Sequence, residues 1–282
     1  MTDTDTALLV EPEWLYKHKD DPNVVVVDCP WDYHSYARAH IHGAVCRPGH
    51  PYVKGQDLYG RLSLHVQGSK DFKELLDVLG IQQNTHVVLY DDGDAKYAAR
   101  LWWVLRYYGH KKASLLDGGW QGWLSAGYSI AYQESQQVPK DSDIHPTPDP
   151  ERLITLEQLK ENYKHSEWQI LDTRSDDEYY GRNNRQNKRS GRIPGAIHLE
   201  WDKLLEDPDS NGVRRFRSAG EMKQILDRIG IQKDKTIVTH CQAGIRAAFS
   251  AFCLERLGYP SPRLYDASMA EWANLDEPPL ES

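Results

Sequence analysis

One cysteine of the chain lies where a nucleophile could be activated. Cys241 follows an apolar, β-rich run, Thr236–His240, and a helix is expected from Ala247. The loop between them consists of Gln242, Ala243, Gly244, Ile245 and Arg246. A strand–loop–helix junction can turn several backbone N–H groups toward one point, and the helix dipole adds partial positive charge there. With the charge of Arg246 nearby, these features favour a thiolate at Cys241, the nucleophilic form of cysteine.

We expect the other cysteines and the neighbouring histidine to be structural. Cys29 follows a predicted buried strand, Cys253 lies within an apolar helix, and Cys46 is assigned to the same class. His240 should point away from the thiol, because neighbouring residues of a strand alternate between its two faces. The sequence has no Cys-x-x-Cys pair and no Cys/His cluster with zinc spacing, so it predicts no metal site.

The elements around Cys241 occur twice in the chain. Residues 75–91, LLDVLGIQQNTHVVLYD, align without a gap with residues 225–241, ILDRIGIQKDKTIVTHC. Three further pairs of segments keep the same order, namely 24–28 with 169–172, 41–44 with 193–196, and 116–123 with 265–272. Such a repeat indicates two copies of one domain. We place the domains at residues 8–130 and 151–282, joined by a polar, proline-rich linker at residues 131–150.

Each copy is expected to alternate strands and helices. In the first copy, a strand at residues 24–28 precedes a helix that Gly80 ends, and a second strand at residues 87–90 precedes another helix. The second copy has the same order of elements. This alternation implies an α/β fold, with a parallel sheet and helices on both of its faces. Ligands of such sheets bind outside the carboxyl ends of the strands, where Cys241 lies.

Net charge and hydropathy limit the classes of partner and the location expected for this protein. The 282 residues carry a formal net charge of −8, which opposes nucleic-acid binding but allows a local basic pocket for a small anion. No run of 18 or more apolar residues is present, so no membrane span is expected. Residues 1–6 are polar and acidic without the cationic start of a secretory signal. We therefore expect a cytoplasmic protein with reduced thiols.

These landmarks together resemble the rhodanese domain. The strand and the Cys-x-x-Gly-x-Arg loop are preceded by Leu171-Asp-Thr-Arg174 with Glu178, and by Gly191-Arg-Ile-Pro-Gly-Ala196. The tandem copy is similar to the two-domain thiosulfate sulfurtransferases, over about residues 15–272. The resemblance implies two rhodanese-like domains, each with a mostly parallel, five-stranded sheet flanked by helices.

The resemblance also implies a reaction. Cys241 would attack the outer sulfur of thiosulfate, become a persulfide and release sulfite. A thiophilic acceptor, cyanide in the usual assay, would then take the sulfur, so ping-pong kinetics are expected. Backbone N–H groups of the loop would stabilise the persulfide and the departing anion. The partners are thus a small anionic sulfur donor and an unknown acceptor, and no cofactor is implied.

The first copy has Asp91 where the second has Cys241. A carboxylate cannot form a persulfide, and its charge would repel thiosulfate. We therefore expect the first domain to be catalytically inactive.

Several residues depart from the family pattern. Mammalian thiosulfate sulfurtransferases have a substrate-binding arginine at a position that spacing assigns here to Glu178, so Arg182 is the nearby substitute. Arg182 opens a basic segment, residues 182–192, which is either an anion-attracting lip or a solvated loop. Arg246 is expected to orient the loop and attract the anion, with Asp172 or Glu178 as a partner. Three aromatic residues could line a cleft between the domains: Trp31, Tyr97 and Trp201.

Three other functions compete with thiosulfate transfer. Enzymes that use 3-mercaptopyruvate have a loop resembling Cys-Gly-Ser-Gly-Val-Thr, whereas this chain has Gln242, Ala243 and Arg246. Phosphatases and arsenate reductases have five residues between cysteine and arginine, and here only four intervene. A persulfide carrier that serves a protein partner is compatible with the same loop.

Overall fold

The chain folds into two units, each described here by itself. The computed structural model describes residues 7–47, 54–56, 62–135 and 139–281. Unit 1 comprises Met1–Pro148 with Leu205–Phe216, and unit 2 comprises Asp149–Leu204 with Arg217–Ser282. The polar residues 1–6 and residues 136–138 of the expected linker lie outside the described residues.

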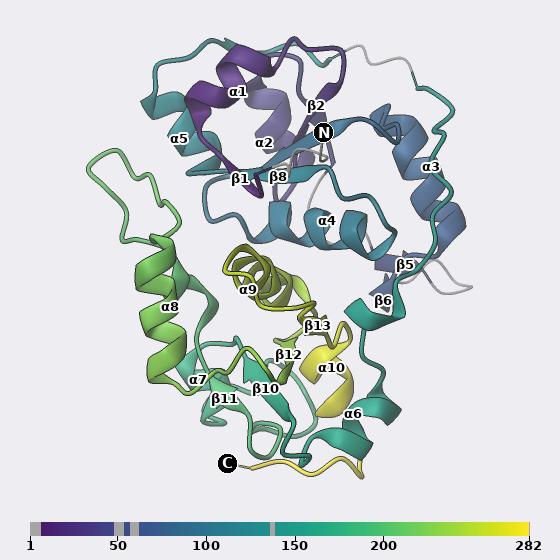
Figure 1. Cartoon of the computed structure of the whole chain (residues 1–282), viewed down its shortest axis with the longest axis vertical. Helices are drawn as coiled ribbons and strands as arrows, with labels where there is room; N and C mark the ends of the chain where they lie inside the picture. Colours follow the sequence, from purple (N-terminus) through teal and green to yellow (C-terminus); the bar gives the residue numbers. More distant parts are fainter. Residues whose placement is uncertain (1–6, 48–53, 57–61, 136–138, 282) are drawn as a thin grey trace. The chain divides into compact units, whose positions relative to one another are not determined.

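Unit 1 is built on a parallel five-stranded sheet (Figure 1). Its strand order is β1 (Leu9–Val10), β8 (Ala113–Leu116), β7 (His86–Tyr90), β2 (Val24–Asp28) and β4 (Val45–Cys46). Its helices are α1 (Pro12–His18), α2 (Tyr33–Arg38), α3 (Ser69–Leu79), α4 (Lys96–Tyr107) and α5 (Gly119–Ser125). Two small antiparallel pairs complete the unit: β3 (His40–Ile41) with β9 (Ile130–Ala131), and β5 (Lys54–Gln56) with β6 (Leu62–Val66).

Unit 2 repeats this plan with four parallel strands. Their order is β11 (Ile197–His198), β10 (Trp168–Asp172), β12 (Thr236–His240) and β13 (Arg263–Leu264). Its helices are α6 (Leu156–Asn162), α7 (Asp176–Tyr179), α8 (Ala219–Arg228), α9 (Ile245–Arg256) and α10 (Ser268–Trp272), with 3₁₀ turns η1 (Pro150–Arg152) and η2 (Trp201–Leu204). The α/β fold class is thereby confirmed.

The expected fifth strand of unit 2 is reduced to an isolated bridge. Leu153 pairs with Leu264, at the place where β1 pairs with β8 in unit 1. The reason is local: η1 ends at Arg152 and α6 begins at Leu156, so very few residues are left to extend along β13.

Within each unit, the two central strands of the sheet end at paired residues. Asp28 of β2 pairs with Tyr90 of β7, and Asp172 of β10 pairs with His240 of β12. The residue that follows each pair, Asp91 or Cys241, therefore leaves the sheet at its carboxyl edge. This register positions the two strand-end loops equivalently within their own units.

Buried helices support these loops from behind. α4 packs on β7 and β8, and α9 packs on β12 and β13. Nine of the twelve residues of α9 are buried, among them Cys253. Helix α8 is amphipathic instead, and a capping box between Ser218 and Glu221 starts it. The apolar residues of α9 lie on most of its circumference, as expected for a helix that is covered on most sides.

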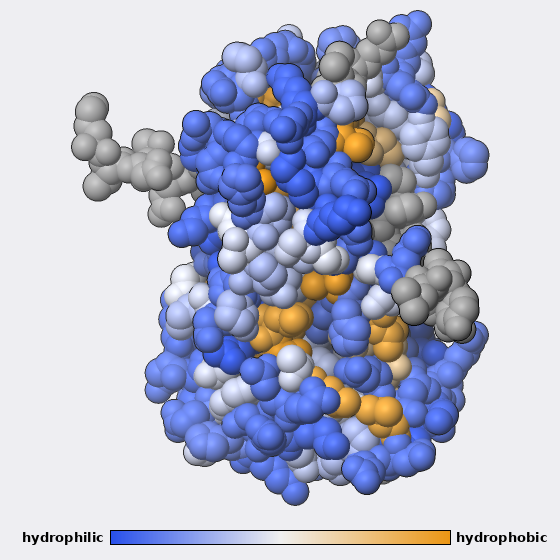
Figure 2. Space-filling view, turned by 90° about the vertical axis from the view of Figure 1, so that its right-hand side faces the viewer, coloured by the Kyte–Doolittle hydropathy of each residue, from blue (hydrophilic) through white to orange (hydrophobic). Residues whose placement is uncertain are grey.

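The surface in view is mainly hydrophilic (Figure 2). Within the part of the chain that the structure describes, no helix has the length and hydropathy needed to cross a bilayer. The segment Leu205–Phe216 joins unit 1 through a hydrogen bond from the Phe216 amide to Asp117 Oδ1, at 2.9 Å.

Candidate active site

Cys241 is fixed by its backbone at the end of β12. Its N–H donates to Ser268 Oγ at 3.1 Å, and its carbonyl accepts from the Met269 amide at 3.1 Å. The Ala270 amide binds the Gln242 carbonyl at 2.9 Å, so α10 holds the first two residues of the loop. Cys241 is 2% exposed, and a thiol covered so closely is reached more readily by a small donor than by a bulky one.

Gly244 makes the turn from loop to helix. It is the N-cap of α9, and its φ of 80° lies in the left-handed region that glycine adopts without strain. Gln242 and Ala243 are half-buried, whereas Gly244 and Ile245 are buried.

The corresponding loop of unit 1 shows what this geometry binds. The Asp91 carboxylate accepts hydrogen bonds from four backbone amides, those of Gly93 (3.1 Å), Ala95 (2.8 Å), Tyr97 (2.9 Å) and Ala98 (3.2 Å). Ala95, the N-cap of α4, has φ 61° and corresponds to Gly244. The loop and the first turn of the helix thus form a ring of donors around the Asp91 carboxyl group.

By position, the amides of Gly244, Arg246 and Ala247 in unit 2 correspond to the donors Ala95, Tyr97 and Ala98 of unit 1. Helices α4 and α9 both have 12 residues and both follow a left-handed N-cap, which fixes this correspondence. A thiolate or persulfide on Cys241 would take the place that the Asp91 carboxylate fills in unit 1.

Arg246 is paired with Glu178. Its two terminal nitrogens donate to the two carboxylate oxygens at 2.6 and 2.8 Å, and Ser175 Oγ also donates to Glu178. Burial acts to raise the pKa of Glu178, but the hydrogen bond and charge of Arg246 hold it below its usual value. Burial acts to lower the pKa of Arg246, but Glu178 and the nearby Cys241 raise it overall. Of the two partners expected for Arg246, Glu178 is therefore the one it binds.

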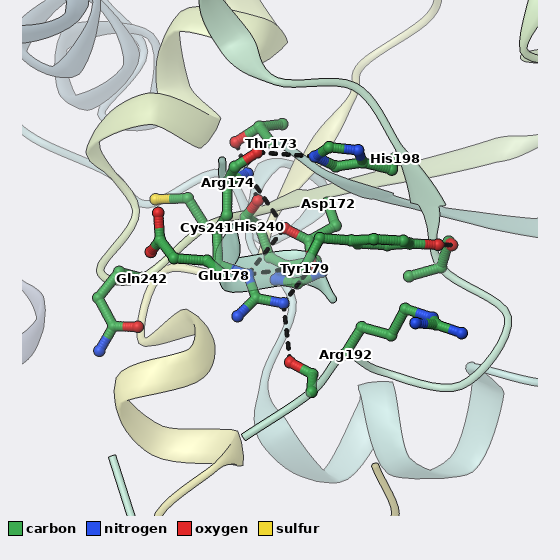
Figure 3. A network of polar contacts seen from close by, with 12 residues as sticks. Asp172, Thr173, Arg174, Glu178, Tyr179, Arg192, His198, His240, Cys241 and Gln242 are labelled. Atoms are coloured by element: carbon green, nitrogen blue, oxygen red, sulfur yellow. Dashed lines mark hydrogen bonds and ion pairs between the residues drawn. The ribbon is translucent and has the colours of Figure 1, made fainter. Parts of the chain in front are cut away.

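A second buried ion pair lies behind the cysteine (Figure 3). Arg174 donates to Asp172 at 2.6 Å and to the Gly191 carbonyl at 2.9 Å, with both side chains almost fully buried. This arrangement connects the end of β10 to the segment before β11.

His240 belongs to this pair rather than to the thiol. Its Nε2 lies 3.7 Å from Asp172 Oδ2, and Figure 3 shows the Cys241 sulfur pointing away from it. Burial lowers the pKa of His240 to about 4, although Asp172 acts to raise it, so the ring is neutral at pH 7. The residues described contain no group of three or more His, Cys, Asp or Glu side chains that could hold a metal ion.

The basic segment 182–192 anchors the end of the chain. Arg189 donates to the carbonyls of Trp272 (2.9 Å) and Pro278 (2.7 Å), and Arg192 lies 3.6 Å from Glu281. Arg182 is more than half exposed and pairs with Asp177 at 2.7 Å. Contact of Arg182 with substrate stays a prediction.

The same segment contributes a residue that sequence reasoning missed. Asn187, only 7% exposed, exchanges two hydrogen bonds with the side chain of Gln242, at 2.9 and 3.1 Å. Asn274 donates to the same Asn187 oxygen at 2.9 Å. Neutral amides carry no charge pattern, so nothing in the sequence singled this contact out.

Ser268 was also missed, although the repeat contained the signal. It has φ 55°, and its counterpart in the repeat, Gly119, has φ 52°. The residues that follow them make equivalent bonds, since the Trp120 amide donates to the Asp91 carbonyl at 2.9 Å as the Met269 amide does to that of Cys241. A non-glycine residue here costs about 1–2 kcal/mol. What the serine supplies is its hydroxyl, which accepts from Cys241 and donates to the Tyr265 carbonyl at 2.7 Å.

The three aromatic candidates pack within their own units. Trp31 is half exposed and its ring centroid lies 5.5 Å from that of Tyr97, whereas Trp201 packs edge-on against Phe249 at 5.3 Å. Their contact with substrate stays a prediction.

Comparisons with known proteins agree on one family. The sequence matches the rhodanese-like domain over residues 11–126 and 155–275. It is 31% identical to a sulfur carrier protein, TtuD, of Thermus thermophilus, covering 97% of this chain and 96% of that protein. It is 29% identical to a thiosulfate sulfurtransferase of Pseudomonas aeruginosa, covering 99% and 98%. The crystal structure of a 3-mercaptopyruvate sulfotransferase from Escherichia coli superposes with a TM-score of 0.80 at 26% identity, covering 93% of this chain and 99% of that one.

The buried Asp91 predicts a pH-dependent stability. Burial and the nearby Asp94 raise the pKa of Asp91 to about 7, although the ring of amides acts to lower it. The unfolded carboxyl group ionises near pH ~4, so the folded chain holds the extra proton and its stability falls as pH rises from about 4 to about 7. Urea unfolding at about pH 5 and about pH 8 should show a smaller fall for Asp91→Asn than for the wild type. An equal fall in both proteins would assign the effect to other groups.

Ser268 predicts a contrast between two small substitutions. Both Ser268→Gly and Ser268→Ala remove the acceptor for the Cys241 amide, but only alanine keeps a side chain at positive φ. We expect Ser268→Ala to lower the free energy of unfolding by about 1 kcal/mol more than Ser268→Gly does. Urea titrations of the two variants test this, and identical losses would show that position 268 is not strained.

Proposed function

Because this chain belongs to the rhodanese family of sulfurtransferases, we propose that it transfers sulfane sulfur from thiosulfate to a thiophilic acceptor through a persulfide on Cys241. One observation carries the proposal: the junction that holds Cys241 recurs in unit 1, where its backbone amides bind the Asp91 carboxylate. This supports the proposal, because Cys241 follows the equivalent strand of unit 2 and precedes the equivalent helix.

In the first half-reaction, the Cys241 thiolate attacks the outer sulfur of thiosulfate. A bond forms between the two sulfur atoms, the bond between the sulfane sulfur and the sulfite sulfur breaks, and sulfite leaves with that electron pair. The amides of the loop and of the first turn of α9 stabilise the negative charge on the persulfide. Arg246 belongs to the same loop, and its pairing with Glu178 fixes its orientation.

In the second half-reaction, the acceptor attacks the outer sulfur of the persulfide. The bond between the two sulfurs breaks, and the thiolate of Cys241 is restored. With cyanide as acceptor the product is thiocyanate. Donor and acceptor use the same sulfur in turn, so parallel lines are expected in double-reciprocal plots.

Unit 1 has no nucleophile at the equivalent position. The Asp91 carboxylate satisfies the amides of its loop, and a carboxylate cannot carry a sulfane sulfur. We propose that unit 1 is catalytically inactive.

Two observations bear on the donor. The Cys241 loop lacks the small hydroxylated residues of mercaptopyruvate enzymes and has Gln242, Ala243 and Arg246 instead. This difference favours thiosulfate as the donor. The similarity to a sulfur carrier protein favours a second candidate function, delivery of the Cys241 persulfide to a protein. A much higher kcat/KM with 3-mercaptopyruvate than with thiosulfate would contradict the thiosulfate assignment.

Cys241→Ser is predicted to abolish thiocyanate formation, because oxygen cannot form the persulfide. The protein should also fail to gain the mass of one sulfur after thiosulfate treatment, as measured by intact-protein mass spectrometry. Cys46→Ser is the matched control, since that thiol is the partly exposed one among the other cysteines. Residual thiocyanate formation by Cys241→Ser would contradict a mechanism that passes through a Cys241 persulfide.

A further inference from the structure

The charged groups around the Cys241 loop cancel in pairs. Arg174 is neutralised by Asp172, and Arg246 by Glu178, both through short charge-assisted hydrogen bonds. His240 is neutral, and the loop residues Gln242 and Ala243 carry no charge. The Cys241 loop, at the N-terminus of α9, therefore receives no net positive charge from these four ionised side chains.

This balance bears on the donor, because thiosulfate carries two negative charges. Bringing a dianion to a thiolate gathers three negative charges where the paired side chains contribute none in compensation. A donor with one negative charge meets less repulsion. Burial strengthens the effect, since Glu178 is 2% exposed and solvent screens it weakly.

We propose that Glu178 sets the charge class of the sulfur donor. By neutralising Arg246 it disfavours dianionic donors relative to monoanionic ones that present the same sulfane sulfur. Glu178 is thus a specificity-determining residue, which acts through Arg246, and the inference rests on the proposed function of Cys241.

The geometry gives Glu178 a fixed position for this role. Both of its oxygens are bound, Oε1 by Arg246 and Oε2 by Arg246 and Ser175. Figure 3 shows its carboxylate on the same side of the polar network as the Cys241 sulfur. Both Glu178 and Cys241 raise the pKa of Arg246, so the guanidinium interacts with both groups. The negative charge of Glu178 therefore contributes to the electrostatic potential that a donor meets at Cys241.

Two donors of similar shape test the proposal. Thiosulfate is a dianion, and methanethiosulfonate is a monoanion that would give the same persulfide while methanesulfinate leaves. Glu178→Gln keeps the shape of the side chain and frees the charge of Arg246. We expect kcat/KM for thiosulfate to rise about tenfold, mainly through KM, while that for methanethiosulfonate changes less than about threefold. Loss of kcat/KM for both donors in parallel would show a purely structural role and overturn the proposal.

A charge cycle keeps the test decisive if Glu178→Gln alone folds poorly. Arg246→Gln leaves Glu178 uncompensated, and it should lower the ratio of thiosulfate to methanethiosulfonate kcat/KM. Adding Glu178→Gln to Arg246→Gln restores zero net charge and should return the ratio to that of the wild type. An unchanged ratio across this cycle would also overturn the proposal.

Glu221→Gln is the matched control. Glu221, like Glu178, accepts in a capping box from a serine at a helix N-terminus in unit 2, but it is exposed. It should leave the donor ratio unchanged, and a shift equal to that of Glu178→Gln would count against the proposal. Failure of the wild type to gain a sulfur from either donor would instead refute the proposed function itself.

Discussion

The structure depends on one constraint: backbone N–H groups at the junction of a buried strand and a buried helix converge on the residue that ends the strand. Helix N-termini leave such groups without intrahelical partners, so a negative charge is stabilised there. In unit 1 four amides bind the carboxyl group of Asp91. Much of the surrounding architecture keeps this junction in place: the parallel register, the apolar α9 and the contacts from α10.

The two units have the same backbone arrangement at the strand end but different side chains there. Asp91 and Cys241 occupy equivalent positions, and the segments that bind their carbonyls, Trp120 and Met269, are equivalent too. Gly119 in unit 1 and Ser268 in unit 2 share a left-handed backbone, so the fold itself requires that conformation. The hydroxyl of Ser268 accepts a hydrogen bond from the Cys241 amide, while the backbone of Ser268 is strained. Such backbone strain is typical of functional sites.

Charge around the cysteine is regulated by pairing rather than by removing charged residues. Buried arginines need partners, because an isolated buried charge is costly. Asp172 and Glu178 supply them, and each also connects segments that are distant in sequence. The basic segment 182–192 has a similar structural use, since Arg189 and Arg192 hold residues 272–281. The number of basic residues in segment 182–192 is therefore a poor measure of the positive electrostatic potential that a substrate meets.

The sequence by itself determined the repeat, the α/β class and the position of Cys241 at a strand end, because these follow from hydrophobic periodicity, glycine positions and residue order along the chain. It also predicted that His240 points away from the thiol, since alternation on a strand is a local property. Only the tertiary structure decided the partner of Arg246, the Asn187–Gln242 amide pair and the hydroxyl of Ser268 beneath Cys241. Those contacts join residues 27 to 68 positions apart, and no local pattern encodes such distances. The reduction of the fifth strand of unit 2 to a single bridge was likewise decided by the tertiary structure, because the 3₁₀ turn η1 and the helix α6 flank Leu153 closely.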